Sequence, residues 1–263
     1  MAQTLAEIRE ALKVANRAEY EALARALAAD ERKGVKAALK SAARRLAAED
    51  AEAARLEGMY SFQAKLAGGG IAVGLDEVGR GPVAGPLAIG AVVLPDDPRV
   101  EGVNDSKQLS AERREEIAAV VREVAIAWDI EYIQPQEIDE HGMTWALRTA
   151  NLRAIAAIEE QLSAKGASLD AVLLDGNAQH LDAREVNIVK GDGKCASIAA
   201  ASIIAKVDRD ALMCRYAERF PHYGFESNKG YASAEHIEAI KQYGLSPVHR
   251  ASFCRAWTQE TLF

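Results

Sequence analysis

Acidic residues in three separate segments have the types and spacing that a divalent-cation site requires. Asp76 and Glu77 follow one short apolar run, Asp175 follows another, and Asp208 and Asp210 lie in a long Ala-rich stretch. Glycines follow the first two segments, so the backbone there can turn and bring neighbouring carboxylates onto one site. Hard cations such as Mg²⁺ bind carboxylate oxygens and keep several waters. Asp before Gly is also common turn chemistry, but the joint occurrence of these acids favours a metal site.

Short apolar runs and longer helical patterns alternate after residue 70. The runs typical of buried strands cover 71–75, 87–94, 125–133, 171–174 and 185–189. Helical patterns cover 110–124, 144–162, 194–220 and 234–243, and small residues at the start of the third would let it lie close to a sheet. This order predicts an α/β domain with a mixed central sheet, flanking helices and a helical C-terminal region.

The first 67 residues have a different composition, rich in Ala, Glu and Arg and without proline. Val35, Leu39, Ala42 and Leu46 follow one another at helical spacing. The triple glycine at 68–70 breaks this pattern, as a domain boundary would. We therefore predict two domains, a helical N-terminal extension over 1–67 and a catalytic domain over 68–263.

A row of basic residues lies on the predicted N-terminal helix. Arg32, Lys36, Lys40 and Arg44 recur every fourth residue, so they share one helical face. This face could bind the phosphates of a nucleic-acid duplex. An ordinary solvated helix surface explains the pattern about as well.

Six motifs, in order along residues 71 to about 255, resemble those of bacterial ribonuclease HII, the type 2 class of ribonuclease H. The motifs are Asp76–Pro82 (DEVGRGP), Asn104–Lys107 (NDSK), Asp175–Gly176, Lys190–Asp192 (KGD), Ser197–Asp210 (SIAAASIIAKVDRD) and Asn228–Tyr231 (NKGY). One such motif would be weak support, whereas six in order are strong. The helical extension, including the stretch 32–35, also resembles one found in some family members.

The resemblance implies a ribonuclease H-like fold and four catalytic, metal-binding acids, which are Asp76, Glu77, Asp175 and Asp210. It favours Asp210 over Asp208 because the family's helix motif ends in Arg-Asp. The helical geometry agrees in part, since positions two apart point in different directions. The implied cofactor is Mg²⁺ or Mn²⁺, with two ions about 4 Å apart when substrate is bound.

The resemblance also implies the substrate, an RNA–DNA hybrid or a DNA duplex that contains ribonucleotides. The enzyme would cut the RNA strand, including single embedded ribonucleotides, and leave 5′-phosphate and 3′-hydroxyl ends. The turn Gly79–Arg80–Gly81 would read the 2′-hydroxyl, and Tyr231 would stack on the neighbouring deoxyribose. Ser106 and Lys107, in a polar loop, could hold a backbone phosphate. Without the family context, a tight turn and a packed aromatic would be the simpler interpretations.

The bulk composition predicts a cytoplasmic protein with no membrane segment. The chain is 49% hydrophobic and 27% charged with a net charge of −7, and no run approaches the roughly 18 apolar residues of a membrane span. Cys195, Cys214 and Cys254 are far apart and should be reduced and unpaired. Because of the negative net charge, binding to a polyanion would need basic patches or bound cations.

The last five residues, Gln259–Phe263 (QETLF), look like the short peptides that dock bacterial proteins on the replication sliding clamp. A match of this length also arises by chance. Three other functions stay open at this point: a ribonuclease HIII-like or other ribonuclease H-fold nuclease, a non-catalytic hybrid-binding module, and a scaffold acting through the helical extension. The four acids argue against the last two.

Overall fold

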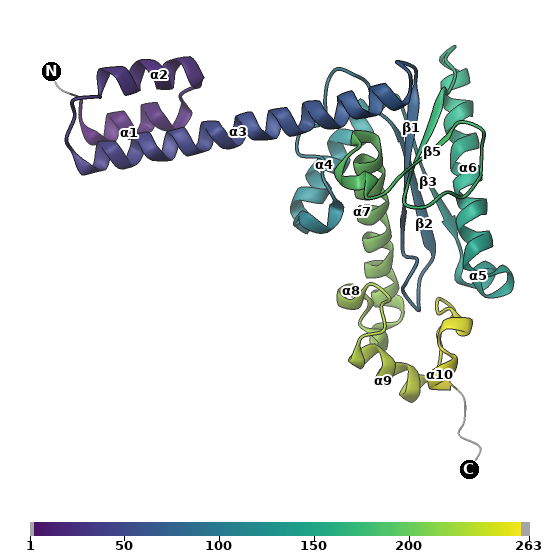
Figure 1. Cartoon of the computed structure of the whole chain (residues 1–263). Coiled ribbons are helices and arrows are strands. Elements are labelled where there is room, and N and C mark those ends of the chain that lie inside the picture. The colour runs from purple at the N-terminus through teal and green to yellow at the C-terminus, as the bar shows by residue number, and fades with distance from the viewer. Residues whose placement is uncertain (1–2, 259–263) are drawn as a thin grey trace. The chain divides into compact units, whose positions relative to one another are not determined.

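The computed structural model describes residues 3–258 (Figure 1). It divides into two compact units, one ending at Glu57 and the other beginning at Gly58. Helix α3 (Lys33–Leu66) belongs to both units. The predicted boundary at residues 67 and 68 therefore marks the end of α3, whereas the packing changes earlier, within the helix. The predicted tail segment 259–263 lies outside the described residues.

The N-terminal unit consists of α1 (Leu5–Val14), α2 (Arg17–Ala26) and the first part of α3. Capping boxes start both short helices, with Thr4 and Glu7 at α1 and Asn16 and Glu19 at α2. Ile8, Leu12, Val35 and Ala42 form the buried core of this unit. The apolar stripe predicted for the long helix is thus the face that packs on α1.

The catalytic unit is built on one five-stranded sheet with the order β3-β2-β1-β4-β5. β1 (Ala72–Val78), β2 (Leu87–Val93) and β3 (Ala127–Ile133) pair antiparallel. β4 (Ala171–Asp175) and β5 (Glu185–Ile188) continue the sheet in parallel beside β1. The mixed sheet and the five strands are as predicted, with end points shifted by a few residues.

Helices cover both faces of this sheet (Figure 1). α6 (Met143–Ser163) packs on one face, and α7 (Ala196–Arg219) packs on the other against β1 and β2. A Cβ atom at Gly74 would lie 2.3 Å from the backbone of α7, and one at Gly90 would lie 2.2 Å from the carbonyl of Ala201. The close approach predicted from the small residues of α7 is confirmed, and two strand glycines make it possible.

The remaining helices complete the unit. α4 (Ala111–Val124) packs on α7, α5 (Pro135–His141) precedes α6, and α8 (Phe225–Asn228), α9 (Ala234–Tyr243) and α10 (Arg255–Thr258) form a small C-terminal lobe. Tyr223, Phe225 and Ile240 are in the buried core of this lobe. In the part of the chain that the structure describes, no helix combines the length and the apolar character that a bilayer crossing requires.

Two buried histidines in this lobe form a hydrogen-bonded chain. The Ser246 N–H donates to Nδ1 of His249 at 2.9 Å, so the proton of that ring is on Nε2, which donates to Nε2 of His236 at 3.0 Å. Nδ1 of His236 donates to the carbonyl of Tyr231 at 2.7 Å. Protonation of either ring would place two N–H groups against each other. Burial and the neighbouring His236 accordingly lower the pKa of His249 to about 4.

Because of this histidine pair, we expect the folded protein to lose stability in acid. The unfolded chain binds a proton at His249 near pH 6.5, whereas the folded chain does so only near pH 4. Stability is therefore fully present above pH 6.5, and about 3 kcal/mol is lost as the pH falls towards 4. His249→Gln, whose amide oxygen can still accept from Ser246, should flatten this part of the curve in urea unfolding at several pH values.

The exposed His222 provides the matched control, because its replacement by Gln leaves the buried chain intact. The two variants should differ only between pH 6.5 and 4. An equally steep acid loss in His249→Gln and in the wild type would contradict this account of the pair.

Candidate active site

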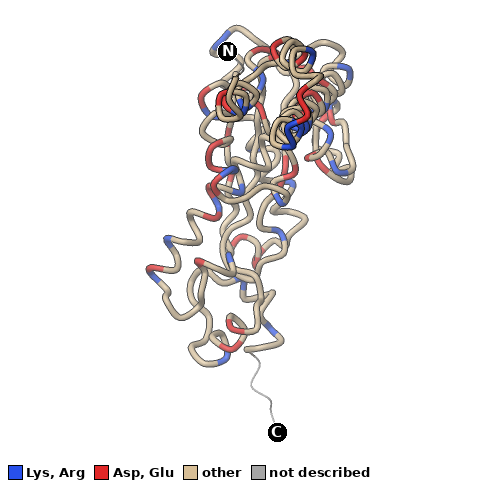
Figure 2. Tube along the Cα trace, turned by 90° about the vertical axis from the view of Figure 1, so that its left-hand side faces the viewer, with Lys and Arg blue, Asp and Glu red and all other residues tan. Residues whose placement is uncertain are grey.

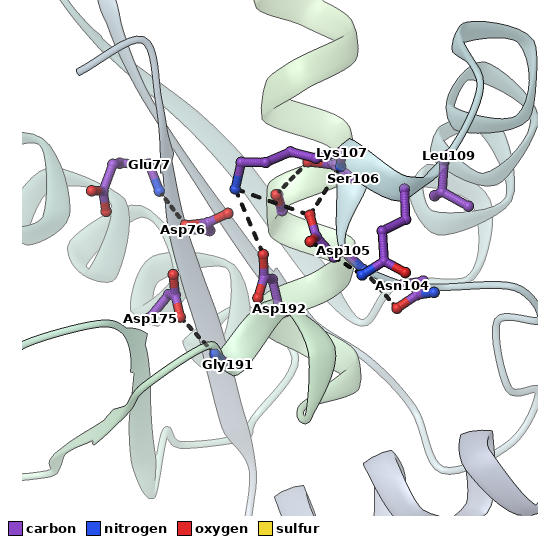
Figure 3. Close-up of polar contacts among 12 residues, drawn as sticks. Asp76, Glu77, Asn104, Asp105, Ser106, Lys107, Leu109, Asp175, Gly191 and Asp192 are labelled. Atoms are coloured by element: carbon purple, nitrogen blue, oxygen red, sulfur yellow. Dashed lines mark hydrogen bonds and ion pairs between the residues drawn. The ribbon is translucent and has the colours of Figure 1, made fainter. Parts of the chain in front are cut away.

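Asp76 and Asp175 lie on neighbouring strands at the same level of the sheet. β1 and β4 are parallel, and Leu75 pairs with Leu174, so the next residue on each strand is the acid. Residues paired in this way point to the same face because side chains alternate in phase along adjacent strands. Asp175 Oδ1 accepts from the Gly191 N–H at 2.6 Å. Figure 3 shows both carboxylates together with that of Asp192.

Glu77 points away from Asp76. The expected backbone turn between them is absent, because β1 continues to Val78 and successive side chains therefore alternate. The Glu77 N–H donates to Asp76 Oδ1 at 2.8 Å (Figure 3). The Glu77 carboxylate lies 3.5 Å from the guanidinium of Arg80. The two acids are thus adjacent, but each faces its own side of the strand.

A further acid, Asp192, joins this group, and the sequence analysis did not assign it a role. It lies in the short 3₁₀ turn Gly191–Gly193 between β5 and α7 and is 8% exposed. Lys107 Nζ lies 3.9 Å from its carboxylate and 4.0 Å from that of Asp105 (Figure 3). The family-like motif Lys190–Asp192 was the available signal, because it places an acid directly before the helix that packs on β1.

The electrostatics of the group favour a bound cation. Burial raises the pKa of Asp76 to about 7, the negative charges of Glu77, Asp175 and Asp192 act in the same direction, and a hydrogen bond from Ser202 opposes them. Burial also raises the pKa of Glu77 and of Asp192, helped in both by Asp175. Several buried carboxylates without enough positive charge are the donor set that Mg²⁺ or Mn²⁺ suits.

The side chains do not yet surround an ion. Within residues 3–258, no three His, Cys, Asp or Glu side chains are arranged as a ready metal cluster. Glu77 would have to leave Arg80 and rotate to face the other acids. The residues therefore fit a divalent cation in chemistry and position, with a side-chain adjustment on binding.

Asp210 is not part of this group. Ser202 marks where α7 passes the acids, because it bonds to Asp76. Asp210 lies eight residues further along the helix, which is about 12 Å at 1.5 Å per residue. Its carboxylate accepts from Lys206 Nζ at 2.8 Å. Asp208 faces elsewhere and pairs with Arg122 of α4, in line with its predicted place outside the site.

Of the two residues of the polar loop before α4 that were predicted to contact substrate, one has a buried side chain and one an exposed side chain. Ser106 is 4% exposed and its hydroxyl bonds to that of Ser202 at 2.9 Å, so this side chain fixes the loop to α7. The side chain of Lys107 is 81% exposed and stands beside the acids. Lys107 is therefore the residue of this loop that is free to meet a phosphate.

The predicted ribose-reading residues do lie next to the acids. A pocket of about 270 Å³ is lined by Asp76, Glu77, the turn Gly79–Gly81, Lys107, Lys206 and Tyr231. Tyr231 is 52% exposed, and its ring lies 3.6 Å from the point where a Cβ atom of Gly81 would stand. The turn and the tyrosine thus form two walls of one pocket that has the acids at its base.

The two glycines of the turn should respond differently to alanine. Gly79 has φ +89°, and a Cβ atom there would lie 2.2 Å from the buried side chain of Arg209, so Gly79→Ala should destabilise the fold by about 2 kcal/mol or more. At Gly81 a Cβ atom meets only Tyr231, at 3.6 Å. Gly81→Ala should keep wild-type stability and lose activity, since the added methyl group projects into the pocket. Thermal unfolding and initial rates measure the two effects.

Equal loss of stability in both variants would contradict this division of roles. Gly58→Ala is the matched control, because a Cβ atom there meets nothing within 4 Å. It should leave the rate unchanged and, because Gly58 lies within helix α3, raise stability by up to about 1 kcal/mol.

Sequence comparisons identify the family of this chain. The family model described as ribonuclease HII matches residues 73–256, and the model of the ribonuclease HII N-terminal domain matches residues 4–67. Ribonuclease HII of Ruminiclostridium cellulolyticum is 43% identical over 80% of this chain and 81% of its own length. That of Halalkalibacterium halodurans is 42% identical over 86% of this chain and 84% of its own.

Solved structures show the same fold. Ribonuclease H2 from Pyrococcus horikoshii is 28% identical with a TM-score of 0.59, covering 71% of this chain and 96% of that one. A structure of the PCNA:RNase HII complex from Archaeoglobus fulgidus gives 29% identity and the same TM-score over 73% and 98% of the two chains. The ribonuclease H fold predicted from the sequence is confirmed. The chain belongs to the ribonuclease HII family and is a divalent-metal-dependent endoribonuclease that acts on RNA–DNA hybrids.

Proposed function

We propose that this enzyme also cuts at single ribonucleotides embedded in duplex DNA and leaves 5′-phosphate and 3′-hydroxyl ends. One observation supports this most: the buried acid Asp76 and the turn Gly79–Gly81 line the same pocket. A site that senses one 2′-hydroxyl beside the acids needs no further ribonucleotides to recognise its substrate. A ribonuclease HIII-like enzyme that requires a long hybrid is the less favoured alternative.

Mg²⁺ or Mn²⁺ is the proposed cofactor, with two ions present when substrate is bound. Asp76, Asp175 and Asp192 would hold them, and Glu77 would join after leaving Arg80. When bound, the ions stabilise the negative charge that develops on the scissile phosphate and on the leaving oxygen. Asp210 was predicted as the fourth ligand, but its contact with Lys206 gives that role no support.

Basic side chains around the acids would guide the nucleic-acid backbone. Lys107 and Lys206 line the pocket that contains the turn. A second hollow of about 400 Å³, lined by Glu77, Asp175, Arg80 and Arg148, lies on the other side of Glu77. Phosphates on either side of the scissile bond could meet these cations, while Tyr231 stacks on the deoxyribose that follows. An acidic protein can bind a polyanion in this way, through local patches and bound cations.

The test is cleavage of a duplex that contains one ribonucleotide, compared with a long hybrid and with an all-deoxy duplex. Mg²⁺-dependent cutting of the first at the ribonucleotide, abolished by EDTA, is the expected result. Product ends can be read by ligation and by phosphatase sensitivity. Cutting of the long hybrid alone would favour the HIII-like alternative. Cutting of neither would refute the proposed activity.

The N-terminal unit is proposed to touch duplex phosphates through Arg32, Lys36, Lys40 and Arg44. All four are exposed, although Arg32 pairs with Asp30 and Lys36 with Glu31. Figure 2 shows basic and acidic residues interspersed along the chain, so the field of this face is modest. Changing Lys36, Lys40 and Arg44 to Gln should weaken binding and flatten its salt dependence. Lys13→Gln with Arg25→Gln is the control, and equal effects in both sets would remove the proposal.

Residues Gln259–Phe263 are proposed to dock on a sliding clamp. The support is the motif and the PCNA complex of the Archaeoglobus relative. An extended peptide ending in Leu-Phe can insert both side chains into an apolar pocket. Full-length protein should bind the clamp in a pull-down and the chain lacking 259–263 should not. Equal, negligible binding by both would refute this docking.

The proposed location is the cytoplasm, with access to chromosomal DNA. Cys195, Cys214 and Cys254 are all free, two of them buried and one exposed. An exposed thiol without a disulfide partner is typical of a reducing compartment.

A further inference from the structure

Two arginines, Arg209 of α7 and Arg250, are buried behind the ribose-reading turn. Arg209 is 1% exposed and Arg250 is 0% exposed. In the described part of the chain neither makes an ion pair with a carboxylate, and the hydrogen bonds from both guanidinium groups go to backbone carbonyls. Burial lowers the pKa of Arg250 to about 9, and the positive charge of Arg209 acts in the same direction. Asp210 acts on Arg209 and Asp139 on Arg250, but both acids lie beyond ion-pair distance, so two like charges buried together are a costly arrangement.

The carbonyls that they bind belong to the walls of the substrate pocket. Arg250 donates to the carbonyls of Gly79 at 2.6 Å, Arg80 at 3.1 Å and Gly85 at 2.8 and 3.0 Å. Arg209 donates to those of Ala84, Pro86 and Lys229 at 3.1, 2.9 and 3.0 Å. The turn and its return to β2 are therefore fixed from behind.

Arg209 also ties the turn to the tyrosine. Lys229, whose carbonyl it binds, is followed by Gly230, and the Gly230 carbonyl accepts from the N–H groups of Val83 and Ala84 at 2.8 and 3.2 Å. Tyr231 comes next in the chain. One guanidinium thus links the segment that follows the turn to the residues that precede Tyr231.

The directions of these carbonyls also determine where the neighbouring backbone N–H groups point. Among residues 3–258 the only cis peptide is Asp97–Pro98, so the bonds after Gly79 and Arg80 are trans. In a trans peptide the C=O of one residue and the N–H of the next point in opposite directions. Because the Gly79 and Arg80 carbonyls point inward to Arg250, the N–H groups of Arg80 and Gly81 point outward. The structure shows no hydrogen bond from either N–H to a described residue.

We propose that Arg209 and Arg250 are positioning residues for ribose selection, which hold the turn so that the Arg80 and Gly81 N–H groups meet the 2′-hydroxyl oxygen. This inference rests on the proposed function of the turn. It also accounts for Gly79, where a Cβ atom would lie 2.2 Å from Arg209 Nε. The two guanidinium charges additionally make the back of the pocket positive, which favours the approach of a phosphate.

The test separates reading of the ribose from general duplex binding. Arg250→Lys and Arg209→Lys keep one charge but can satisfy fewer carbonyls. For each, kcat and KM are measured on a single-ribonucleotide duplex, and the Ki of the same duplex without the ribonucleotide is measured as a competitor. We expect kcat/KM to fall by about tenfold or more, the loss of one well-aligned hydrogen bond, with Ki within about twofold of wild type.

Ile240→Val, 1% exposed in the same lobe, is the control for loosened packing. It should lower the thermal midpoint and leave the ratio of Ki to KM unchanged. A purely structural role of the arginines predicts that kcat/KM and duplex affinity fall together, and that result would overturn the proposal. Wild-type kinetics in a folded lysine variant would overturn it as well.

One measurement requires no variant. ¹⁵N relaxation of the wild type should give order parameters of about 0.85 for the Gly79, Arg80 and Gly81 amides before substrate is added. Values below about 0.6 would show that the turn is not held and would overturn the proposal. Failure of the wild type to cut the single-ribonucleotide duplex would instead refute the proposed function and leave this measurement of the turn valid.

Discussion

Asp76→Asn should lower kcat by about 1000-fold or more while the protein stays folded. The carboxylate lies at the base of the substrate pocket, between Glu77, Asp175 and Ser202. Neutral Asn weakens the hold on both cations, which provide several kcal/mol of transition-state stabilisation. Asn keeps an oxygen that can accept from the Glu77 N–H, as Asp76 does at 2.8 Å, so the strand end is preserved. Single-turnover cleavage in saturating Mg²⁺ measures the effect.

Asp76→Asn lowers activity, but without metal we expect it to leave stability unchanged or to raise it. The folded-state pKa of Asp76 is raised from 3.8 to about 7, so the folded chain binds the proton more tightly than the unfolded chain. Stability therefore falls as the pH rises from about 4 to 7, and at pH 8 the buried charge costs on the order of 4 kcal/mol. In EDTA, Asp76→Asn should melt at a temperature equal to or above that of the wild type.

Adding Mg²⁺ should reverse this order. A ligand that binds only the folded state raises the thermal midpoint, and the wild type should gain more than the variant. Asp208→Asn is the control, because Asp208 pairs with Arg122 outside the site and should behave like wild type in both buffers. Equal Mg²⁺ shifts in Asp76→Asn and the wild type would show that Asp76 does not hold the ion.

The sheet, and the side-by-side positions of two of the acids, could be predicted from the sequence. Short apolar runs identified all five strands. The small residues of α7 predicted its close packing, which Gly74 and Gly90 complete from the strand side. Asp76 and Asp175 could be paired because both end apolar runs, and the ends of parallel strands meet at one edge. α1 and α2 were not separated, since their alanine-rich sequence gives one continuous helical signal.

Other features depend on contacts that no local pattern reveals. Glu77 is adjacent to Asp76 in sequence, yet its rotamer is set by Arg80. Arg209 and Arg250 look like ordinary charged residues in the sequence, because burial depends on how the C-terminal lobe folds over the turn. Ser106 was predicted as a phosphate contact; it lines the pocket that contains Asp76, and its hydroxyl bonds to Ser202, 96 residues away. In each case a long-range contact decides the role of a residue type that is common elsewhere.

The second large effect on activity is expected when Asp192 is replaced, and a much smaller one when Asp210 is replaced. Asp192→Asn should lower kcat/KM by about 100-fold or more, the loss expected for one pre-organised charge at the reacting phosphate. Its carboxylate is 8% exposed, and its negative charge raises the pKa of Asp76. Asp210→Asn should stay within about threefold of wild type, because an exposed or part-buried ion pair such as Asp210–Lys206 contributes little.

The two substitutions are chemically identical, and Asp192 lies just before α7 while Asp210 lies within it, so each serves as the other's control. Helical rise alone separates Asp210 from the level of Ser202 by about 12 Å, more than a carboxylate can span to share an ion held by Asp76. A severe loss in Asp210→Asn with a neutral Asp192→Asn would mean that α7 shifts by two turns on substrate binding. Such a shift would have to break the packing of Gly74 and Gly90 on the backbone of α7, where no space for sliding exists. The geometry of the sheet and helix therefore favours Asp192 over Asp210 as the fourth acid, and these two variants test that choice.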